Sequence, residues 1–329
     1  MRLGSPPHPF IKWLKGDDEP IFWVSGKAAS GKSTLMKYVW RDRRLKKCLM
    51  TWAGGSTLLL CHFFLSDRGD NLQKSREGIL QGVLLQLIKA EPELAIVGFP
   101  LVFDSAGFAT MPLVPINWKS LKGALDRIIS FTEAKDWKIC MFINGLDKYR
   151  NIERVADYTE EELNIITHSD EADASWGTNA LISDNRREIL KFLLNLARTS
   201  SGLKLCLSSR ELAAFEEALS RFPRLRVHEH TREDITAYAL TSFSNCAVAS
   251  PARRKALADD IAQRSSGVFL WVRLVVDHII ALYSNEGEQA DLHKALGLFP
   301  RQLGGQNGLY MKMLSLVAEK DRLDGRRVI

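Results

Sequence analysis

The stretch Ile21-Phe-Trp-Val-Ser-Gly-Lys-Ala-Ala-Ser-Gly-Lys-Ser-Thr34 decides the fold of this 329-residue chain. It opens with an apolar run, Ile21–Ser25, which is typical of a buried strand. Gly26 and Gly31 then frame a short turn, and a helical pattern begins at Lys32. A strand, a glycine-containing turn and a helix in direct succession predict a unit of an α/β fold.

The turn and the start of the helix match the pattern G-x-x-x-x-G-K-[ST] in full. Glycines allow backbone angles that other residues resist, and successive N–H groups at the start of a helix donate to phosphate oxygens. The pattern therefore predicts that the chain binds ATP or ADP together with Mg²⁺. The residues expected to contact the nucleotide are Gly26, Lys27, Ala28, Ala29, Ser30, Gly31, Lys32, Ser33 and Thr34.

Three of these side chains have separate expected roles. Lys32 is expected to reach the β- and γ-phosphates, and Ser33 to ligate Mg²⁺ through its hydroxyl. Thr34 is placed to hydrogen-bond the α-phosphate. The sequence thus predicts a phosphate-binding loop whose functional side chains lie in the first turn of the helix.

Apolar runs alternate with helical patterns over the first two-thirds of the chain, which favours a mostly parallel sheet with crossover helices. We expect an α/β fold in which the first strand leads into the phosphate-binding loop. The expected strands are residues 21–25, 58–65, 138–143, 203–208 and 225–228. The expected helices are residues 32–41, 77–90, 121–131 and 187–198.

The sequence pattern changes near Thr231, where Thr-Arg-Glu-Asp is a helix-start signal and only helical periods follow. We therefore expect a nucleotide-binding domain followed by a helical one. The expected parts are an N-terminal lead at 1–20, the nucleotide-binding domain at 21–228 with a polar insertion at 149–185, a helical domain at 229–300, and the truncated start of a further helical or winged-helix domain at 301–329.

Composition limits the classes of partner. Lys and Arg exceed Asp and Glu by 45 − 39 = 6, and the densest basic run, residues 41–47, is interpreted as solvated cations at the end of a helix. The five cysteines include no C-x-x-C pair, which predicts reduced thiols. Neither a signal peptide nor a membrane-spanning run is recognisable, so we expect a cytoplasmic protein that contacts no membrane and no nucleic acid.

A second element of the site is expected after the apolar run 138–143, because Mg²⁺ and the attacking water require a nearby carboxylate. The sequence there reads Asn144-Gly-Leu-Asp147-Lys148. It resembles the NACHT branch of the STAND signalling ATPases, particularly the fungal NACHT proteins, in which this strand end reads Phe-Ile-Asp-Gly-Leu-Asp-Glu. Asn144 replaces the magnesium-associated Asp of the family, and Lys148 replaces the Glu implicated in hydrolysis. Asp147 is retained.

Other segments resemble fungal NACHT proteins in the same order along the chain, namely residues 22–37, 73–78, 205–210, 230–235 and 266–272. The resemblance places Arg210 at a sensor position for the γ-phosphate. It implies that Asp147 and Arg210 are the catalytic residues, and that Ser33 and Asn144 lie at the metal.

Two further positions have family counterparts near the nucleotide. Gly267 falls where many STAND proteins have a nucleotide-contacting Gly-x-Pro, but Phe269 in place of the proline favours a packing role here. Phe10 and Trp13 fall where the N-terminal lead of the family passes near the base, and core packing is the favoured interpretation for both.

The resemblance implies a switch in intracellular signalling of the NLR-like type, with a setting in fungal non-self recognition or heterokaryon incompatibility. ADP would hold a closed form, and ATP exchange would open it for self-oligomerisation and activation of fused or separate effector and repeat domains that this chain lacks. Hydrolysis is expected to be slow at best, because Asn144 and Lys148 lack the acidic groups.

Two alternatives remain open. The first is an actively hydrolysing, stand-alone P-loop ATPase, and the second is a nucleic-acid-binding protein that uses the basic run 41–47.

Overall fold

The computed structural model describes residues 8–66, 69–103, 117–150, 176–245, 250–286 and 291–300, without the side chains of 176–185 and 286. The chain divides into two compact units. The first comprises Met1–Ser25 and Lys32–Leu225, and the second comprises Gly26–Gly31 and Arg226–Ile329. The phosphate-binding loop therefore groups with the second unit, although the strand before it and the helix after it belong to the first.

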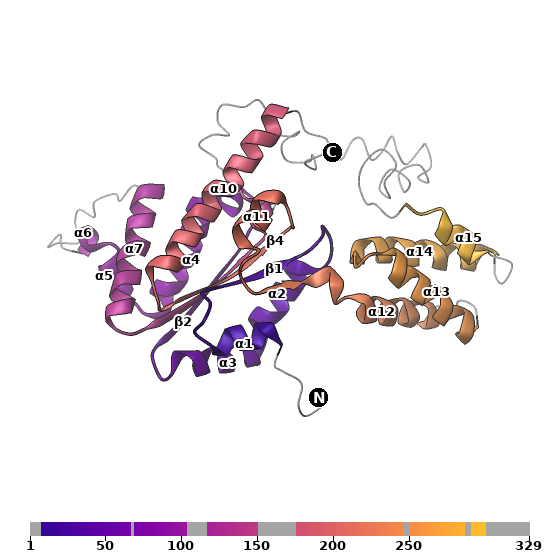
Figure 1. Ribbon diagram of the computed structural model, residues 1–329, viewed down its shortest axis with the longest axis horizontal. Helices are drawn as coiled ribbons and strands as arrows, with labels where there is room; N and C mark the ends of the chain where they lie inside the picture. Colours follow the sequence, from indigo (N-terminus) through magenta and orange to yellow (C-terminus); the bar gives the residue numbers. More distant parts are fainter. Residues whose placement is uncertain are drawn as a thin grey trace. The chain divides into compact units, whose positions relative to one another are not determined.

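A five-stranded sheet in the order β2-β3-β4-β1-β5 organises the first unit (Figure 1). The strands are β1 (Ile21–Ser25), β2 (Leu58–Phe64), β3 (Lys138–Asn144), β4 (Leu203–Ser209) and β5 (Arg224–Arg226). The β2–β3, β3–β4 and β4–β1 pairs are parallel. The predicted α/β class is confirmed, and so are the first four strands to within a residue or two at each end.

Helices cover both faces of this sheet, because successive strand residues point to opposite faces. Ile21 and Trp23 pack with the helices α4 (Arg76–Ala90), α7 (Trp118–Ala134) and α10 (Trp176–Thr199). Figure 1 shows these helices on one side of the sheet and α1 (Pro9–Lys15) and α3 (Arg43–Ala53) on the other. The strands β1, β3 and β4 are consequently buried on both faces, which explains why they read as continuous apolar runs, whereas most residues of β2 are only half-buried.

The remaining elements of the first unit are short or follow a loop. They are α2 (Lys32–Arg41), α5 (Glu93–Gly98), α6 (Pro100–Phe103), α11 (Ala213–Leu219) and the 3₁₀ turns η1 (Leu72–Lys74) and η2 (Leu146–Lys148). The α2 helix spans the predicted residues, and α4 and α7 lie where helices were expected.

The basic run 41–47 does not simply end a helix as predicted. The α2 helix ends at Arg41, and Asp42 then begins α3 by accepting from the backbone N–H of Arg44 at 2.8 Å. Hydrogen bonds from the Arg44 side chain lower the pKa of Asp42 to about 2. An N-capping carboxylate thus balances cations at the start of α3, where the helix dipole alone would disfavour them.

The α10 helix begins at Trp176, eleven residues before the predicted start at 187. The predicted polar insertion at 149–185 was therefore wrong over residues 176–185, while 151–175 lie outside the described residues. The first turn of this helix contains three weak helix formers, Gly177, Thr178 and Asn179. Their low helix propensity explains why the sequence did not indicate a helix here. Extension of an established helix adds one backbone hydrogen bond per residue, which compensates for weak propensity.

The second unit is helical in its described residues. It contains η3 (Val227–Glu229), α12 (Arg232–Asn245), α13 (Pro251–Arg264), α14 (Phe269–Glu286) and α15 (Leu292–Gly297). Ile235, Ile261 and Trp271 lie in its core, and the indole of Trp271 donates to the carbonyl of Pro300 at 2.6 Å. Residues 301–329, where a further domain was predicted, lie outside the described residues.

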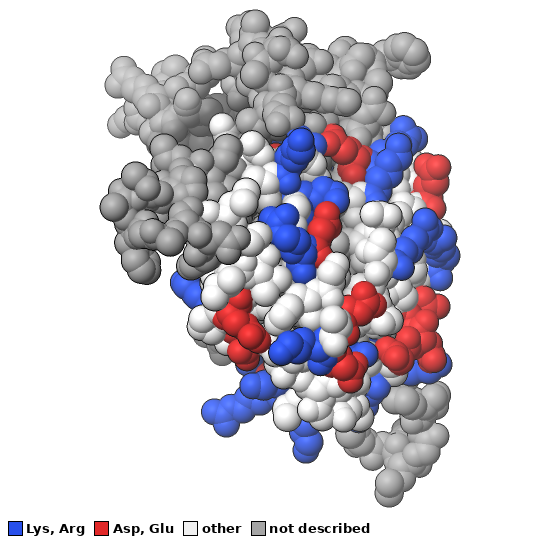
Figure 2. Space-filling view, turned by 90° about the vertical axis from the view of Figure 1, so that its left-hand side faces the viewer, with Lys and Arg blue, Asp and Glu red and all other residues white. Residues whose placement is uncertain are grey.

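The surface carries both signs of charge. On the face shown in Figure 2, lysine and arginine side chains are interspersed with aspartate and glutamate. Within the described part of the chain, no helix is long and apolar enough to cross a membrane.

Candidate functional site

The glycine turn joins β1 to α2 at the carboxyl edge of the sheet. Gly26 and Gly31 have φ angles of 150° and 91°, and Ala29 also adopts a positive φ of 54°. An α-helix starts at Lys32 directly after the turn. The backbone thus takes the left-handed angles that the predicted phosphate-binding loop requires at its glycines.

Within the second unit, this loop packs against the start of α14 and against η3. The Lys27 ammonium donates to the carbonyl of Ser266 at 3.3 Å. A Cβ atom added at Gly31 would lie 3.8 Å from the ring of Phe269, and one added at Gly26 would lie 3.1 Å from Nδ1 of His228. The loop therefore shares a packed surface with the residues that begin the helical unit.

Gly267 is required by the backbone here. Its φ is 81°, and a Cβ at this position would come within 2.2 Å of the carbonyl oxygen of His228. Together with the ring of Phe269 beside Gly31, this gives the Gly267–Phe269 segment a packing role in the structure, as the phenylalanine had suggested.

Lys32 is 9% exposed, and burial lowers its pKa to about 8. Asp147 and Glu211 oppose this shift, whereas Arg210 and Lys148 add to it. The five groups carry three positive and two negative charges, so the site has a net charge of 3 − 2 = +1. A buried ammonium without full compensation is suited to receive an anion.

Asn144 at the end of β3 meets Ser33 at the start of α2. Its side-chain nitrogen donates to the Ser33 hydroxyl at 3.1 Å. Asn144 is 2% exposed, and its Oδ1 has no hydrogen-bond partner among the described residues. Ser30 Oγ is likewise buried without a described partner. Buried oxygens of this kind lose their interactions with water, and a polar or cationic ligand would restore them.

Asp147 and Arg210 form a two-point ion pair. Asp147 Oδ2 accepts from Arg210 Nε at 3.0 Å, and its Oδ1 accepts from the backbone N–H of Arg210 at 3.2 Å. The Asp147 side chain is 9% exposed and that of Arg210 27%. The structure therefore brings the two predicted catalytic residues together, but with both carboxylate oxygens engaged by the arginine.

A family model described as "Nephrocystin 3, N-terminal" matches residues 7–175, which is just over half of the chain. The chain belongs to the nephrocystin 3 N-terminal family. The match covers the phosphate-binding loop, Lys32, Asn144 and Asp147, whereas Arg210 follows it in the sequence.

Solved structures offer weaker similarities to this member of the nephrocystin 3 N-terminal family. The Walker-type ATPase PABY2304 of Pyrococcus abyssi is 10% identical with a TM-score of 0.40, and the match covers 88% of this chain and 69% of that one. A structure of Drosophila ORC bound to DNA is 13% identical with a TM-score of 0.30, covering 88% and 60%. A search of curated proteins gave no match.

Glu211 lies at the site but was not predicted from the sequence. Its carboxylate accepts from the Ser25 hydroxyl at 2.8 Å, and its charge raises the pKa of Lys32. The available signal was its position directly after Arg210 at the end of a strand. Because Ser25 is the last residue of β1, Glu211 lies at the same sheet edge as Lys32.

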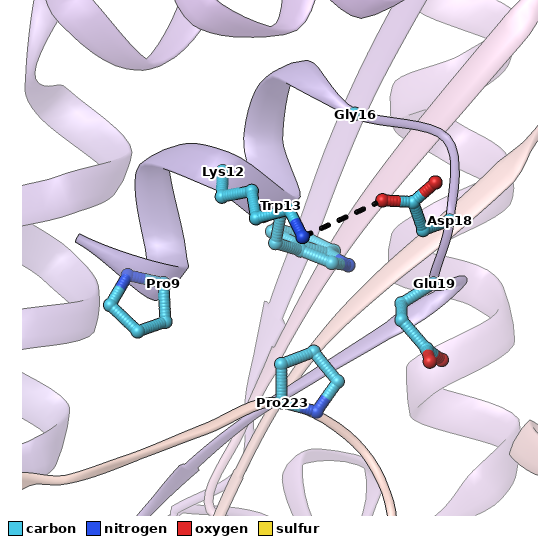
Figure 3. Close-up of a pocket in the computed structure, with 7 residues that line it drawn as sticks. All are labelled: Pro9, Lys12, Trp13, Gly16, Asp18, Glu19 and Pro223. Carbon is cyan, nitrogen blue, oxygen red and sulfur yellow. Dashed lines mark ion pairs between the residues drawn. The ribbon is translucent and has the colours of Figure 1, made fainter. Parts of the chain in front are cut away.

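Trp13 lies against a hollow of about 240 Å³ on α1, shown in Figure 3. Pro9 and Pro223 flank the indole, and the Lys12–Asp18 ion pair crosses in front of it at 3.9 Å (Figure 3). Trp13 is 4% exposed, with its ring centroid 5.6 Å from that of Phe22. The geometry gives Trp13 a packing role between α1 and β1.

Proposed function

We propose that this chain is a nucleotide-binding module that takes ATP or ADP with Mg²⁺ through residues 26–34. The observation that carries the proposal is the buried Lys32 ammonium at the end of a glycine loop with positive φ angles, at the carboxyl edge of a parallel sheet. Ligands of open α/β sheets bind at this edge, and backbone N–H groups at a helix start favour phosphate.

The donor set also suits a magnesium ion. Ser33 would ligate the ion through its hydroxyl, and Asn144 would orient that hydroxyl or a metal-bound water through its amide. Magnesium prefers oxygen ligands and keeps several waters. When bound, the ion would neutralise phosphate charge, while Lys32 and Arg210 supply the positive charge that the chain itself contributes.

We further propose that hydrolysis is slow. Asn144 is neutral where a carboxylate would strengthen the metal site, and Lys148 adds a cation where a base would act on water. Asp147 is occupied by Arg210, which limits its use as a substitute base. Loss of a positioned base lowers a rate by on the order of 10²–10⁴.

We also propose that the chain acts as a nucleotide-dependent switch. Exchange of ADP for ATP would alter the loop, and the helices of the second unit would respond, leading to self-oligomerisation and to contact with effector and repeat domains. The Lys27–Ser266 hydrogen bond and the packing of Phe269 beside Gly31 support this, because loop and helices share one compact unit. The cytoplasmic setting in fungal non-self recognition rests on the sequence resemblance.

Calorimetric titration of the whole chain with Mg²⁺ and ADP tests nucleotide binding. Lys32→Ala should weaken the affinity about 100-fold, because it removes a charge-assisted contact to phosphate. Lys37→Ala is the matched control, since Lys37 is an exposed lysine of the same helix. Equal affinities of parent and both variants would overturn the proposal.

Size-exclusion chromatography with ADP and with a non-hydrolysable ATP analogue tests the switch. A larger species with the analogue alone supports oligomerisation on activation. Monomers under both conditions, in a sample that binds both nucleotides, would refute the switch and leave nucleotide binding intact.

An actively hydrolysing ATPase is the second candidate, and Glu211 is the observation that favours it. This carboxylate lies close enough to Lys32 to raise its pKa and could act on water in place of the absent acids. Steady-state turnover of several per second by the parent chain, lost in Glu211→Gln, would favour this reading over a slow switch.

A further inference from the structure

A groove of about 280 Å³ lies between α10 and α11 and shares no lining residue with the proposed nucleotide site. Its floor is made of small and apolar side chains, Leu190, Leu194, Ala214 and Ala218. Leu190 is 2% and Ala214 6% exposed, so the floor is continuous with the core. None of the described large hydrophobic side chains that are exposed lies in this groove.

Cations surround this floor. The rim is formed by Arg187, Lys191, Arg198, Arg221 and one acid, Glu217, which gives a net charge of 4 − 1 = +3. Glu217 faces Arg187 at 3.8 Å, with exposed fractions of 74% and 50%. With this pair counted, the rim still carries three more positive than negative side chains.

The spacing of the α10 side chains matches a helical partner. Each of the residues Arg187, Leu190, Lys191, Leu194 and Arg198 lies three or four positions from another of the set, so that together they line one face of α10. The groove runs about 16 Å along this helix, which corresponds to about three turns of a docked helix. The guanidinium carbon of Arg221 lies 4.7 Å from the ring centroid of Phe222, a cation–π contact.

We propose that this groove binds an acidic amphipathic helix of a partner protein. Leucine-sized side chains of that helix would fill the space above Ala214 and Ala218, and its carboxylates would meet Lys191, Arg198 and Arg221. A single-stranded nucleic acid would find no aromatic ring in the groove for base stacking. A bilayer would find no exposed large apolar side chain to insert.

The test uses the whole chain and a fluorescein-labelled peptide of about 15 residues, with leucines at helical spacing and glutamates elsewhere. Fluorescence anisotropy should show binding that weakens with salt. The double variant Lys191→Glu with Arg221→Glu should lose about tenfold in affinity. The control Lys46→Glu with Lys47→Glu makes the same change in net charge on the exposed side of α3 and should bind as the parent does.

Two further arms keep the proposal falsifiable. A peptide with lysines in place of the glutamates should bind the Lys191→Glu and Arg221→Glu variant better than the parent. Ala218→Phe should weaken the acidic peptide without changing charge, because the ring fills the floor. Circular dichroism of each variant excludes loss of fold as the cause.

Each result that would contradict the proposal points to a different explanation. Equal loss in the Lys46 and Lys47 control would reduce the effect to net charge and overturn the groove. Binding of phosphatidylserine vesicles or duplex DNA in place of the peptide, lost in the Lys191 and Arg221 variant, would assign the groove to a membrane or to nucleic acid. The chain also carries three consecutive glutamates at 160–162. If only their replacement by glutamine allows the peptide to bind, the occupant belongs to the same chain.

Discussion

The loop after β1 and the strand end of β3 lie at the same edge of one sheet, yet only the loop matches its expected motif in full. The loop keeps every group of the phosphate-binding pattern from Gly26 to Ser33. The β3 end keeps Asp147 but carries Asn144 and Lys148 where acids are expected. Under the proposed function, binding depends on the loop and hydrolysis on the β3 end, so a change in one region should leave the property of the other in place.

The largest expected effect comes from breaking the loop. Gly31→Val should weaken ADP affinity about 100-fold or more, because φ of 91° is strained for a branched side chain and the N–H groups would turn away from phosphate. Gly54→Ala is the matched control, since Gly54 also has a positive φ, 61°, but lies in open space at the end of α3. The control should cost about 1–2 kcal/mol of stability and leave affinity unchanged. Calorimetry and thermal melts separate the two effects.

Restoring the acidic groups at the end of β3 should change ATP turnover and leave nucleotide binding unchanged. Asn144→Asp together with Lys148→Glu should raise single-turnover hydrolysis at least about tenfold, because it returns a metal-associated carboxylate and a base. ADP affinity should change little. A flat rate in the double variant, with a parent that already hydrolyses ATP well, would mean that these two positions are assigned wrongly.

Nucleotide affinity should depend on pH through Lys32. Burial depresses the pKa of Lys32 to about 8, whereas contact with phosphate favours its charged form and raises the pKa in the complex. Affinity is therefore complete below pH 8 and falls as pH rises above it, by about tenfold between pH 7 and pH 9. Calorimetric titrations across this range measure the effect, with the Lys32→Ala variant as the control that should show no such slope.

The smallest expected effect is a change in the pH at which nucleotide affinity is lost. Glu211 raises the pKa of Lys32, so Glu211→Gln should lower this pKa and move the midpoint of the affinity loss to lower pH. Glu217→Gln, at an exposed carboxylate of α11, should leave the midpoint in place. A shift of equal size in both variants would show that Glu211 has no special relation to Lys32.

Much of the architecture was readable from the sequence because its elements are strongly patterned. The strands β1, β3 and β4 are buried on both faces, and α2, α4 and α7 follow recognisable starts. Prediction failed where a local signal was weak or was misread. The first turns of α10 contain poor helix formers, and the basic run 41–47 hides the cap at Asp42.

The phosphate-binding loop was predicted from residues that adjoin in the chain, and Asn144, Asp147 and Arg210 were predicted from the family resemblance. Glu211 was missed because its link to Ser25 crosses from β4 to β1 and leaves no trace in sequence spacing. The same reason hid the pairing of Asp147 with Arg210, which had been expected as two separate groups.

The sequence by itself determined the strand, glycine turn and helix that make the phosphate-binding loop, because backbone angles and helix starts depend on neighbouring residues. Only the tertiary structure decided how Asn144 reaches Ser33, how Arg210 occupies Asp147 and how deeply Lys32 is buried. Those contacts follow from the register of the parallel strands, which aligns Asn144 with Ser208 and Ser25 with Ser209. Packing over the whole sheet fixes this register, and the register in turn determines the distances between residues that are far apart in the chain.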